Sequence, residues 1–262
     1  MKFAVLIGAA VTILAVSILH FNSSSGTGGN VRRSTAAFEP VAVIELFTSQ
    51  GCSSCPPADR VLGQTIINAK NNKQKVFALS FHVDYWNRLG WTDPFSNPDF
   101  SARQTGYVSA LKLNGAYTPQ MIVNGQTEFT GSDERSLNLA ISRALKIKAG
   151  VNFTKLDTVS SPGSLHVRYA LEGNFSGADI HCAVLSLHES TAVKKGENGG
   201  AILKNDNVVR QFNTANASAS GELSFSNLPA SLKENIAVIA YVQEKNNGRI
   251  LGAAQWEPVV KP

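Results

Sequence analysis

Cysteine is scarce in this chain of 262 residues, which contains only three. Three cysteines are too few for a scaffold held together by several disulfides. Cys52 and Cys55 nevertheless stand close together, separated by two serines, whereas Cys182 is distant in the sequence. No second C-x-x-C accompanies the pair, and a tetrahedral zinc site needs four ligands. The pair therefore predicts redox chemistry, with a permanently closed structural disulfide and metal binding as alternatives.

Long runs of like charge are also absent. The 24 basic and 19 acidic residues give a net charge of +5, and the basic residues are scattered along the chain. A nucleic-acid-binding protein typically concentrates its basic residues on one face or helix. With 43% hydrophobic and 16% charged residues, the composition is otherwise that of a globular protein. We therefore expect a folded protein that does not bind nucleic acid.

No acidic residue occurs before Glu39, and the beginning of the chain is apolar. Lys2 precedes an uncharged apolar stretch over residues 3–21, which is the pattern of an export signal. The stretch is also long enough to cross a bilayer as a helix. Residues 1–21 are therefore predicted to be a signal peptide or an N-terminal membrane anchor. Either outcome puts the body in the periplasm, on the envelope or outside the cell. Residues 22–37, rich in serine and glycine, are expected to be a flexible linker.

The body begins with a strand–helix–strand pattern. The run 41–47 is apolar except for Glu45, which is typical of a strand buried on both faces of a parallel sheet. Pro56 and Pro57 fit the first turn of a helix, where a missing N–H costs nothing. A second buried strand is predicted over residues 76–81. The cysteines are thus expected at the helix N-terminus, at the edge of the sheet where the two strands end.

The rest of the chain divides into two kinds of pattern. Residues 82–95 form an insertion rich in aromatic residues, which we place over the cysteine edge, and residues 120–130 predict a hairpin with an Asn-Gly turn. After a closing helix, short alternating runs are typical of an antiparallel sheet. We therefore expect two domains, an α/β domain over 38–150 and a smaller antiparallel β domain over 151–262.

The position of the cysteine pair predicts the role of each thiol. A helix N-terminus stabilises a thiolate and lowers a cysteine pKa from about 8.5 toward roughly 3.5 to 7.5. Cys52, nearer the strand end, is expected to be the exposed attacking thiol. Cys55, in the first turn, is expected to be the resolving thiol that releases the partner from a mixed disulfide. The partners would be protein or small-molecule thiols and disulfides, and the chemistry requires no bound cofactor.

The order of these motifs resembles the thioredoxin superfamily. More narrowly, residues 44–59, 82–86, 117–120 and 196–198 are similar to an exported bacterial thioredoxin-like family catalogued only as a domain of unknown function, number 1223. The resemblance covers about residues 38–260. It implies a thioredoxin-like N-terminal domain and an exported location, and the family has no agreed substrate.

The resemblance to thioredoxins also implies roles for three further residues. Pro119 is expected to follow a cis peptide bond and to face the cysteines, with Thr118 offering its backbone to a substrate strand; an ordinary trans turn is the alternative. Glu45 matches a buried carboxylate that thioredoxins use to take the proton of the resolving thiol, so it is a candidate general base for Cys55. The alternative is a glutamate that only caps the strand end. Because the dipeptide between the cysteines is Ser-Ser, the redox potential does not carry over from thioredoxins.

His82 and Asp84 follow the second strand at the edge where ligands usually bind in open α/β sheets. They are candidates for tuning Cys52 or accepting a proton, and a structural role in the insertion is equally open. Cys182 is expected to be a buried small hydrophobic residue. The main hypothesis is a thiol–disulfide oxidoreductase of the cell envelope. The alternatives are a copper-binding or chaperone module that uses the cysteines with His82, and a non-catalytic interaction protein with a structural disulfide.

Overall fold

The computed structural model describes residues 1, 37–161, 163–229, 232 and 235–258. The predicted export segment and linker lie almost entirely outside the described residues. Within the described part, no helix is both long and apolar enough to cross a membrane.

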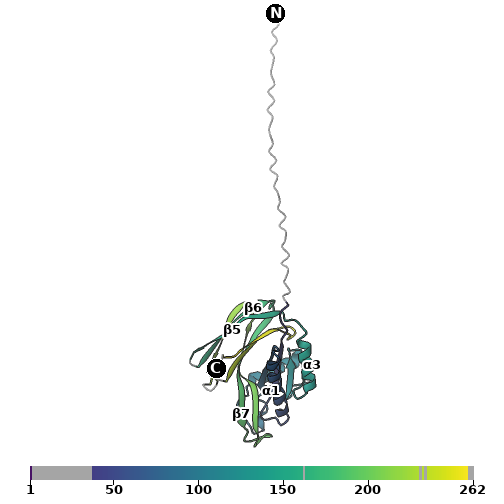
Figure 1. The fold of residues 1–262 in the computed structure, drawn as a ribbon, viewed down its shortest axis with the longest axis vertical. Helices are drawn as coiled ribbons and strands as arrows, with labels where there is room; N and C mark the ends of the chain where they lie inside the picture. Colours follow the sequence, from purple (N-terminus) through teal and green to yellow (C-terminus); the bar gives the residue numbers. More distant parts are fainter. Residues whose placement is uncertain (2–36, 162, 230–231, 233–234, 259–262) are drawn as a thin grey trace. The chain divides into compact units, whose positions relative to one another are not determined.

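The described residues form three α-helices, one short 3-10 helix and eleven strands (Figure 1). The helices are α1 (Pro56–Asn71), α2 (Pro98–Ala110) and α3 (Glu134–Ala144), and the 3-10 helix is η1 (Asn87–Leu89). The strands are β1 (Ala42–Thr48), β2 (Val76–His82), β3 (Gln120–Val123), β4 (Thr127–Thr130), β5 (Val151–Ser161), β6 (Ser164–Gly173), β7 (Ala178–Ala192), β8 (Ile202–Asn216), β9 (Ser220–Ser226), β10 (Ile236–Glu244) and β11 (Ile250–Trp256).

The strand–helix–strand pattern at the start of the body is confirmed. β1 is buried along its whole length and pairs in parallel with β2, so that Thr48 lies opposite His82 at their ends. α1 begins with Pro56 and Pro57, whose missing N–H groups would have no partner in the first turn of a helix. The predicted hairpin is also present, as β3 and β4.

The expected fold class, a thioredoxin-like α/β N-terminal domain followed by a smaller antiparallel β domain, is wrong. One mixed sheet runs in the order β11-β10-β7-β8-β2-β1-β3-β4, so strands from the second half extend the sheet that β1 and β2 begin. The two halves join where Val208 of β8 pairs in parallel with Ser80 of β2. Among the described residues, strands hold 45% and helices 20%, which is a mainly β protein. The apolar pattern of a strand indicates that it is buried but not which sheet it joins, and this is why the prediction failed.

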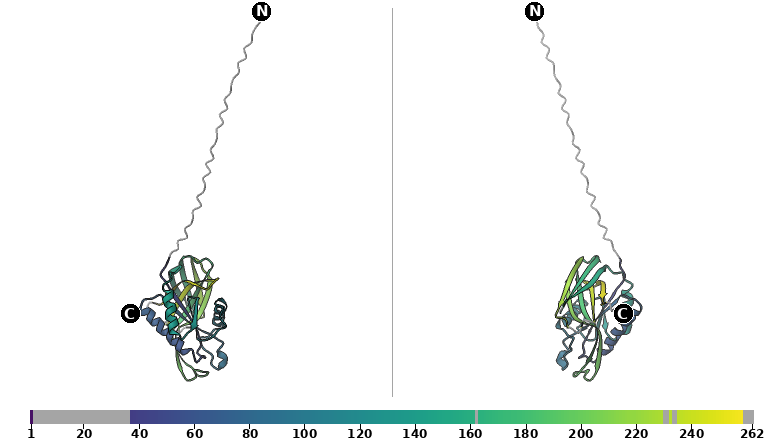
Figure 2. Two further views of the ribbon diagram at one scale, coloured as in Figure 1. Left: turned by 90° about the vertical axis from the view of Figure 1, so that its right-hand side faces the viewer. Right: turned by 60° about the vertical axis from the view of Figure 1, so that its left-hand side comes forward.

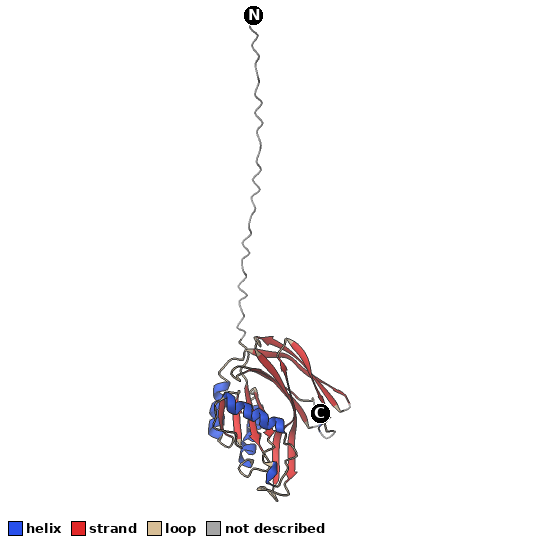
Figure 3. Cartoon of the chain, turned by 180° about the vertical axis from the view of Figure 1, so that it is seen from behind, coloured by secondary structure: helices blue, strands red, loops and turns tan. Residues whose placement is uncertain are grey.

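Helices and a second sheet cover the two faces of the large sheet (Figures 2 and 3). α1 and α3 pack on one face of β1, β2 and β3, and α2 packs on the other face. A three-stranded antiparallel sheet, in the order β5-β6-β9, packs on β7, β10 and β11. The boundary predicted near residue 150 falls between α3 and β5. The division into two domains at this boundary stays a prediction.

Candidate functional site

Cys52 and Cys55 form a disulfide directly before α1. Their Cα atoms are 5.4 Å apart, and Cys55 is the N-cap residue of the helix. The backbone carbonyl of Cys55 accepts hydrogen bonds from the N–H groups of Ala58 and Asp59, which close the first turn. The predicted place of the pair, at a helix N-terminus, is confirmed.

The loop that leads into β3 lies against the disulfide. The peptide bond between Thr118 and Pro119 is cis, as predicted. The Cys52 Sγ atom lies 3.9 Å from the backbone carbonyl oxygen of Thr118. The indole N–H of Trp86, in the aromatic insertion, donates a 2.7 Å hydrogen bond to the Thr118 hydroxyl. Trp86 therefore fixes the backbone that faces the sulfur.

Both cysteines are fully buried, with exposed fractions of 0%. The expectation that Cys52 is exposed is therefore wrong for the disulfide state. The turn that carries the pair is enclosed by the aromatic insertion on one side, where a Cβ atom added to Gly51 would lie 3.1 Å from the Cβ atom of Trp86. It is enclosed on another side by the loop Val193–Ala201, which we call the clasp loop. Sequence patterns did not predict this loop's contact with the cysteines.

The clasp loop is bonded to the turn through two consecutive side chains. The amide of Asn198 donates to the carbonyl oxygens of Gln50 and Cys52, both at 2.9 Å. The carboxylate of Glu197 accepts a 2.9 Å hydrogen bond from the N–H of Ser53. Gly196 precedes them with a φ of 75°, a conformation that favours glycine, and a Cβ atom there would lie 3.2 Å from the Cβ atom of Trp91. The Gly-Glu-Asn motif, which had no chemical explanation in the sequence, therefore holds the cysteine turn.

Glu197 places a negative charge beside the cysteines. The hydrogen bonds from Ser53 hold the pKa of the Glu197 carboxyl below its ordinary value, so it is ionised at neutral pH. The N–H group of Ser53 belongs to the turn whose amides would otherwise stabilise a thiolate on Cys52. Glu197 therefore opposes thiolate formation while the clasp loop is closed.

A group of polar side chains is buried between α1 and the ends of β1 and β2, and we call it the buried polar cluster. Its centre is the pair of His82 Nδ1 and Asp93 Oδ2, which are 2.7 Å apart. Asp93 also accepts a 2.8 Å hydrogen bond from the N–H of Gln50. Its members are Thr48, Gln50, Asp59, His82, Asp93 and Asn205.

The three ionisable members of the cluster have perturbed pKa values. Burial raises the pKa of Asp59 to about 7, although the charge of His82 opposes this shift. Burial also disfavours the charges of His82 and Asp93, but their mutual attraction outweighs it, raising the pKa of His82 and lowering that of Asp93. At neutral pH the His82–Asp93 pair is therefore ionised, and Asp59 is the member that gains or loses a proton.

Glu45 does not lie with the cysteines. Residues alternate between the two faces of a strand, and Glu45 shares the face of β1 that packs on α2. Its Oε2 atom is 2.6 Å from the Nε atom of Arg103 on α2, and its Oε1 atom accepts hydrogen bonds from Arg103 and from the hydroxyl of Tyr107. Arg103 also donates to the hydroxyl of Tyr241 on β10. The structure therefore gives Glu45 a buried ion pair on the face opposite α1.

The other two predicted residues, His82 and Asp84, also lie toward different helices. His82 joins the buried polar cluster on the α1 side, whereas Asp84 accepts a hydrogen bond from the hydroxyl of Ser101 on α2. Thr118 lies beside the disulfide through its backbone carbonyl, as predicted, and the cis bond to Pro119 follows it. Asp59 was not predicted as a site residue, although the sequence pattern could have indicated it. It lies one turn after Cys55 and shares the helix face of the apolar Ala58 and Leu62.

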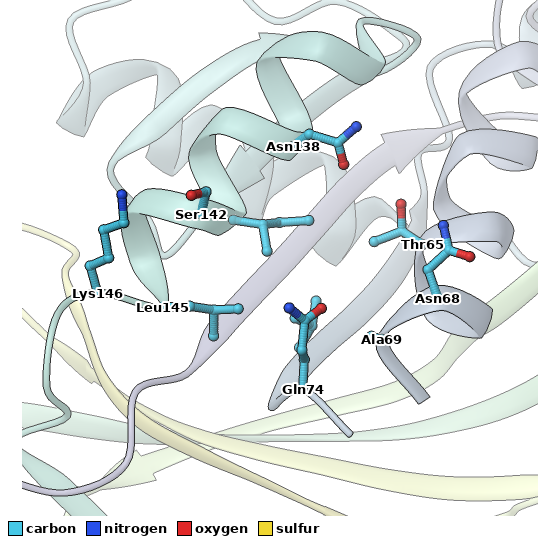
Figure 4. A pocket seen from close by; sticks show the side chains of 10 residues that line it. Thr65, Asn68, Ala69, Gln74, Asn138, Ser142, Leu145 and Lys146 are labelled. Carbon is cyan, nitrogen blue, oxygen red and sulfur yellow. The ribbon is translucent and has the colours of Figure 1, made fainter. Parts of the chain in front are cut away.

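The remaining candidate features of the described residues lie away from the cysteine pair. Cys182, on β7, is fully buried as predicted, and burial raises the pKa of its thiol. Among the described residues, no three or more histidine, cysteine, aspartate or glutamate side chains converge as a metal site. A cavity of about 360 Å³ lies between α1 and α3, at the end of α1 away from the cysteines (Figure 4). Its polar lining includes Asn68, Asn138 and Lys146, so it is separate from the cysteine site.

A protein family and several solved structures are similar to the chain. The sequence model of the family described as Protein of unknown function (DUF1223) matches residues 43–243, which include the cysteine pair and the clasp loop. No curated protein matches the sequence. A solved structure of a protein from Agrobacterium tumefaciens is 30% identical; the match covers 86% of this chain and 100% of that chain, with a TM-score of 0.60.

Two further structures come from Porphyromonas gingivalis. HBP35 is 16% identical over 86% of this chain and 79% of that chain, with a TM-score of 0.59, and this likeness concerns the fold alone. A domain of the outer membrane lipoprotein Omp28 is 14% identical over 41% of this chain and 86% of that chain, with a TM-score of 0.24.

Proposed function

We propose, for a chain that belongs to the family described as Protein of unknown function (DUF1223), that the Cys52–Cys55 pair exchanges disulfides with protein or small-molecule thiols in the cell envelope. The observation that carries the proposal is the closed C-x-x-C disulfide at the N-terminus of α1, with Cys52 facing the carbonyl of Thr118. A disulfide that closes so short a loop restricts the unfolded chain less than one closing a long loop. Stability alone is therefore a weak reason for its presence.

The exchange takes two steps when the pair acts as a reductant. The thiolate of Cys52 attacks a partner disulfide, forms a bond to one of its sulfurs and releases the other as a thiolate. The thiolate of Cys55 then attacks the Sγ atom of Cys52, closes the Cys52–Cys55 bond and releases the second partner thiolate. The partner gains two electrons and the pair loses two. The reverse sequence oxidises a dithiol partner.

Access to the pair requires movement, because both cysteines are buried. The clasp loop holds the turn through Glu197 and Asn198 and no covalent bond joins them, so its opening breaks three hydrogen bonds. The two bonds of the neutral Asn198 amide contribute about 0.5–1.5 kcal/mol each, and the bond to Glu197 is exposed to solvent. The clasp loop is therefore the part of the enclosure whose opening would give a partner access to Cys52.

The burial of Cys52 also favours a second candidate, a non-catalytic protein in which the disulfide is structural. Trapping separates the two functions. We expect a Cys55→Ser variant, reduced and then exposed to oxidised glutathione, to gain one glutathione on Cys52, measured by intact mass. The matched Cys52→Ser variant should gain it far more slowly. If neither variant is modified until denaturant unfolds the chain, the disulfide is structural and the exchange proposal is wrong.

Export is the part of the proposal that rests on the N-terminal pattern, in which Lys2 precedes the apolar stretch 3–21. Fusion of the full chain to a phosphatase that is active only after export tests it. Activity of the fusion in a bacterial host supports an envelope location. An inactive fusion that accumulates inside the cell contradicts it.

A further inference from the structure

Asp59 lies one helical turn after Cys55, on the same buried face of α1. The N–H of Asp59 bonds to the carbonyl of Cys55, and Asp59 is 6% exposed. Side chains at this spacing on a helix are neighbours, with about 5–6 Å between their Cβ atoms. Gly63 lies one turn further along this face of α1, and its missing Cβ atom leaves room for the carboxylate of Asp206 on β8. The helix therefore points a carboxyl group into the protein next to the resolving cysteine.

The packing of apolar side chains does not account for the burial of the Asp59 carboxyl group. Asp59 Oδ1, Thr48 Oγ1 and His82 Nε2 are buried without a hydrogen bond of ordinary geometry in the described part of the chain, although the side chains of Thr48 and Asn205 lie near enough to Asp59 to lower its pKa. An unsatisfied buried polar atom costs about 1–3 kcal/mol. Three such poorly bonded atoms from α1, β1 and the end of β2 make the buried polar cluster costly for stability, which is typical of a functional site.

Charged side chains lie near Asp59 at the end of β2 and in the aromatic insertion, and β8 places further charges against α1. β2 contributes His82, which is paired with Asp93 of the aromatic insertion. β8 contributes Asp206, which is paired with His188, and Arg210, which lies near enough to oppose the charge of His82. The ionised His82–Asp93 pair carries no net charge, so Asp59 is the member of the buried polar cluster that is free to change protonation.

We propose that Asp59 accepts the proton of the Cys55 thiol during the resolving step, and that the His82–Asp93 pair sets the pH at which it does so. In this step the S–H bond of Cys55 breaks and its proton passes to the Asp59 carboxylate. The electron pair left on Cys55 forms the bond to Cys52 Sγ, and the released partner thiolate takes its proton from solvent. Asp59 returns its proton to solvent afterwards. The inference rests on the proposed exchange function and assigns the proton acceptor that Glu45, on the other face of the sheet, does not provide.

The pKa of Asp59 supports this role. Burial raises it to about 7, so near neutral pH the carboxylate is present and still basic enough to take a proton. The rate of the resolving step should therefore rise with pH through about 7. Without Asp59, the rate should instead follow the ionisation of the Cys55 thiol itself.

A stopped-flow experiment measures the two steps separately. The reduced full chain is mixed with the chromogenic disulfide of thionitrobenzoate. The first thionitrobenzoate is released when Cys52 attacks, and the second, at a rate independent of reagent concentration, when Cys55 resolves. We expect Asp59→Asn to leave the first release unchanged and to slow the second about 100-fold at neutral pH, the size of a lost general base. His82→Gln should move the midpoint of the pH profile upward, because it removes the charge that lowers the pKa of Asp59.

Asp206→Asn is the matched control, since it removes another carboxylate that faces α1 and should leave both releases unchanged. If the first release fails in the wild-type chain, the exchange function itself is wrong. If the first release occurs but Asp59→Asn keeps the wild-type second release, or Asp206→Asn slows it equally, only the role of Asp59 is wrong.

A measurement on the wild-type chain covers the case in which Asp59→Asn does not fold. Infrared difference spectra between the oxidised and reduced states should show a change in a protonated carboxyl band near neutral pH. Its absence contradicts a coupling between the redox state of the pair and the protonation of Asp59.

Discussion

The side-chain amide of Asn198 donates a 2.9 Å hydrogen bond to the backbone carbonyl oxygen of Cys52, across 146 residues of sequence. The same amide binds the carbonyl of Gln50. Because Cys52 is buried and the clasp loop holds its backbone, we expect a change that loosens the loop to make the disulfide easier to reach.

Removing the Asn198 amide should therefore accelerate reduction of the disulfide. Asn198→Ala loses both hydrogen bonds, which lowers the free energy of loop opening by about 1–3 kcal/mol. We expect dithiothreitol to reduce this variant about ten times faster than the wild-type chain, measured by quenched alkylation. Asn246→Ala, in an exposed turn, should leave the rate unchanged. Equal rates for Asn198→Ala and the wild type would mean that the clasp loop does not control access.

Neutralising Glu197 should make the pair more oxidising. The carboxylate opposes a thiolate on Cys52, so Glu197→Gln stabilises the reduced state. We expect the reduction potential to rise in glutathione buffers, and the rise to shrink with added salt because Glu197 is exposed. Glu172→Gln, at an exposed position far along the chain, serves as the control. A potential that is unchanged or lower in Glu197→Gln contradicts the electrostatic role.

The stability of the oxidised chain should depend on pH through Asp59. The folded pKa of about 7 lies above the ordinary value of 3.8, so the folded state binds more protons than the unfolded state between these values. The contribution of Asp59 is therefore most favourable below about pH 4 and declines as pH rises to about 7, by on the order of a few kcal/mol.

Urea unfolding of Asp59→Asn over the same pH range tests this linkage. The variant should lack the decline, so its advantage over the wild type grows with pH. Parallel curves for the two proteins would show that Asp59 has an ordinary pKa in the folded state.

Glu45 should matter for stability and not for exchange. Glu45→Gln leaves Arg103 as a buried charge with a weakened partner, and breaking such a pair costs about 3–5 kcal/mol. The free energy of unfolding should fall by that amount, while thiol exchange in the folded variant keeps its wild-type rate. Glu39→Gln, which breaks an exposed pair with Lys75, should cost less than about 1 kcal/mol. Slower exchange in Glu45→Gln would restore Glu45 as a candidate base.

Cys182 should be inert in the folded protein. It is fully buried in β7, and burial raises its thiol pKa. Iodoacetamide should modify Cys52, and Cys55 far more slowly, in the reduced folded chain, and Cys182 only after unfolding, as peptide mass mapping would measure. Rapid modification of Cys182 under native conditions contradicts its placement in the core.

Much of the local structure was predictable because its causes are local. The continuous apolar run predicted β1, and Pro56 and Pro57 predicted the start of α1. Together they placed the cysteines at a helix N-terminus. The cis bond before Pro119 was predicted by resemblance, and it too is a property of one short segment.

The sequence by itself therefore determined the order of the elements in the first half, the position of the cysteine pair and the burial of Cys182. Only the tertiary structure decided that β8 joins β2, that the clasp loop holds the turn of Cys52, and that Glu45 pairs with Arg103 on the face away from the cysteines. The spacing of hydrophobic residues and the preference of certain residues for turns act over a few residues, so they can be recognised in the sequence. The pairing of distant strands and the contacts of a loop depend on which buried surfaces fit together, and these surfaces exist only after the chain has folded.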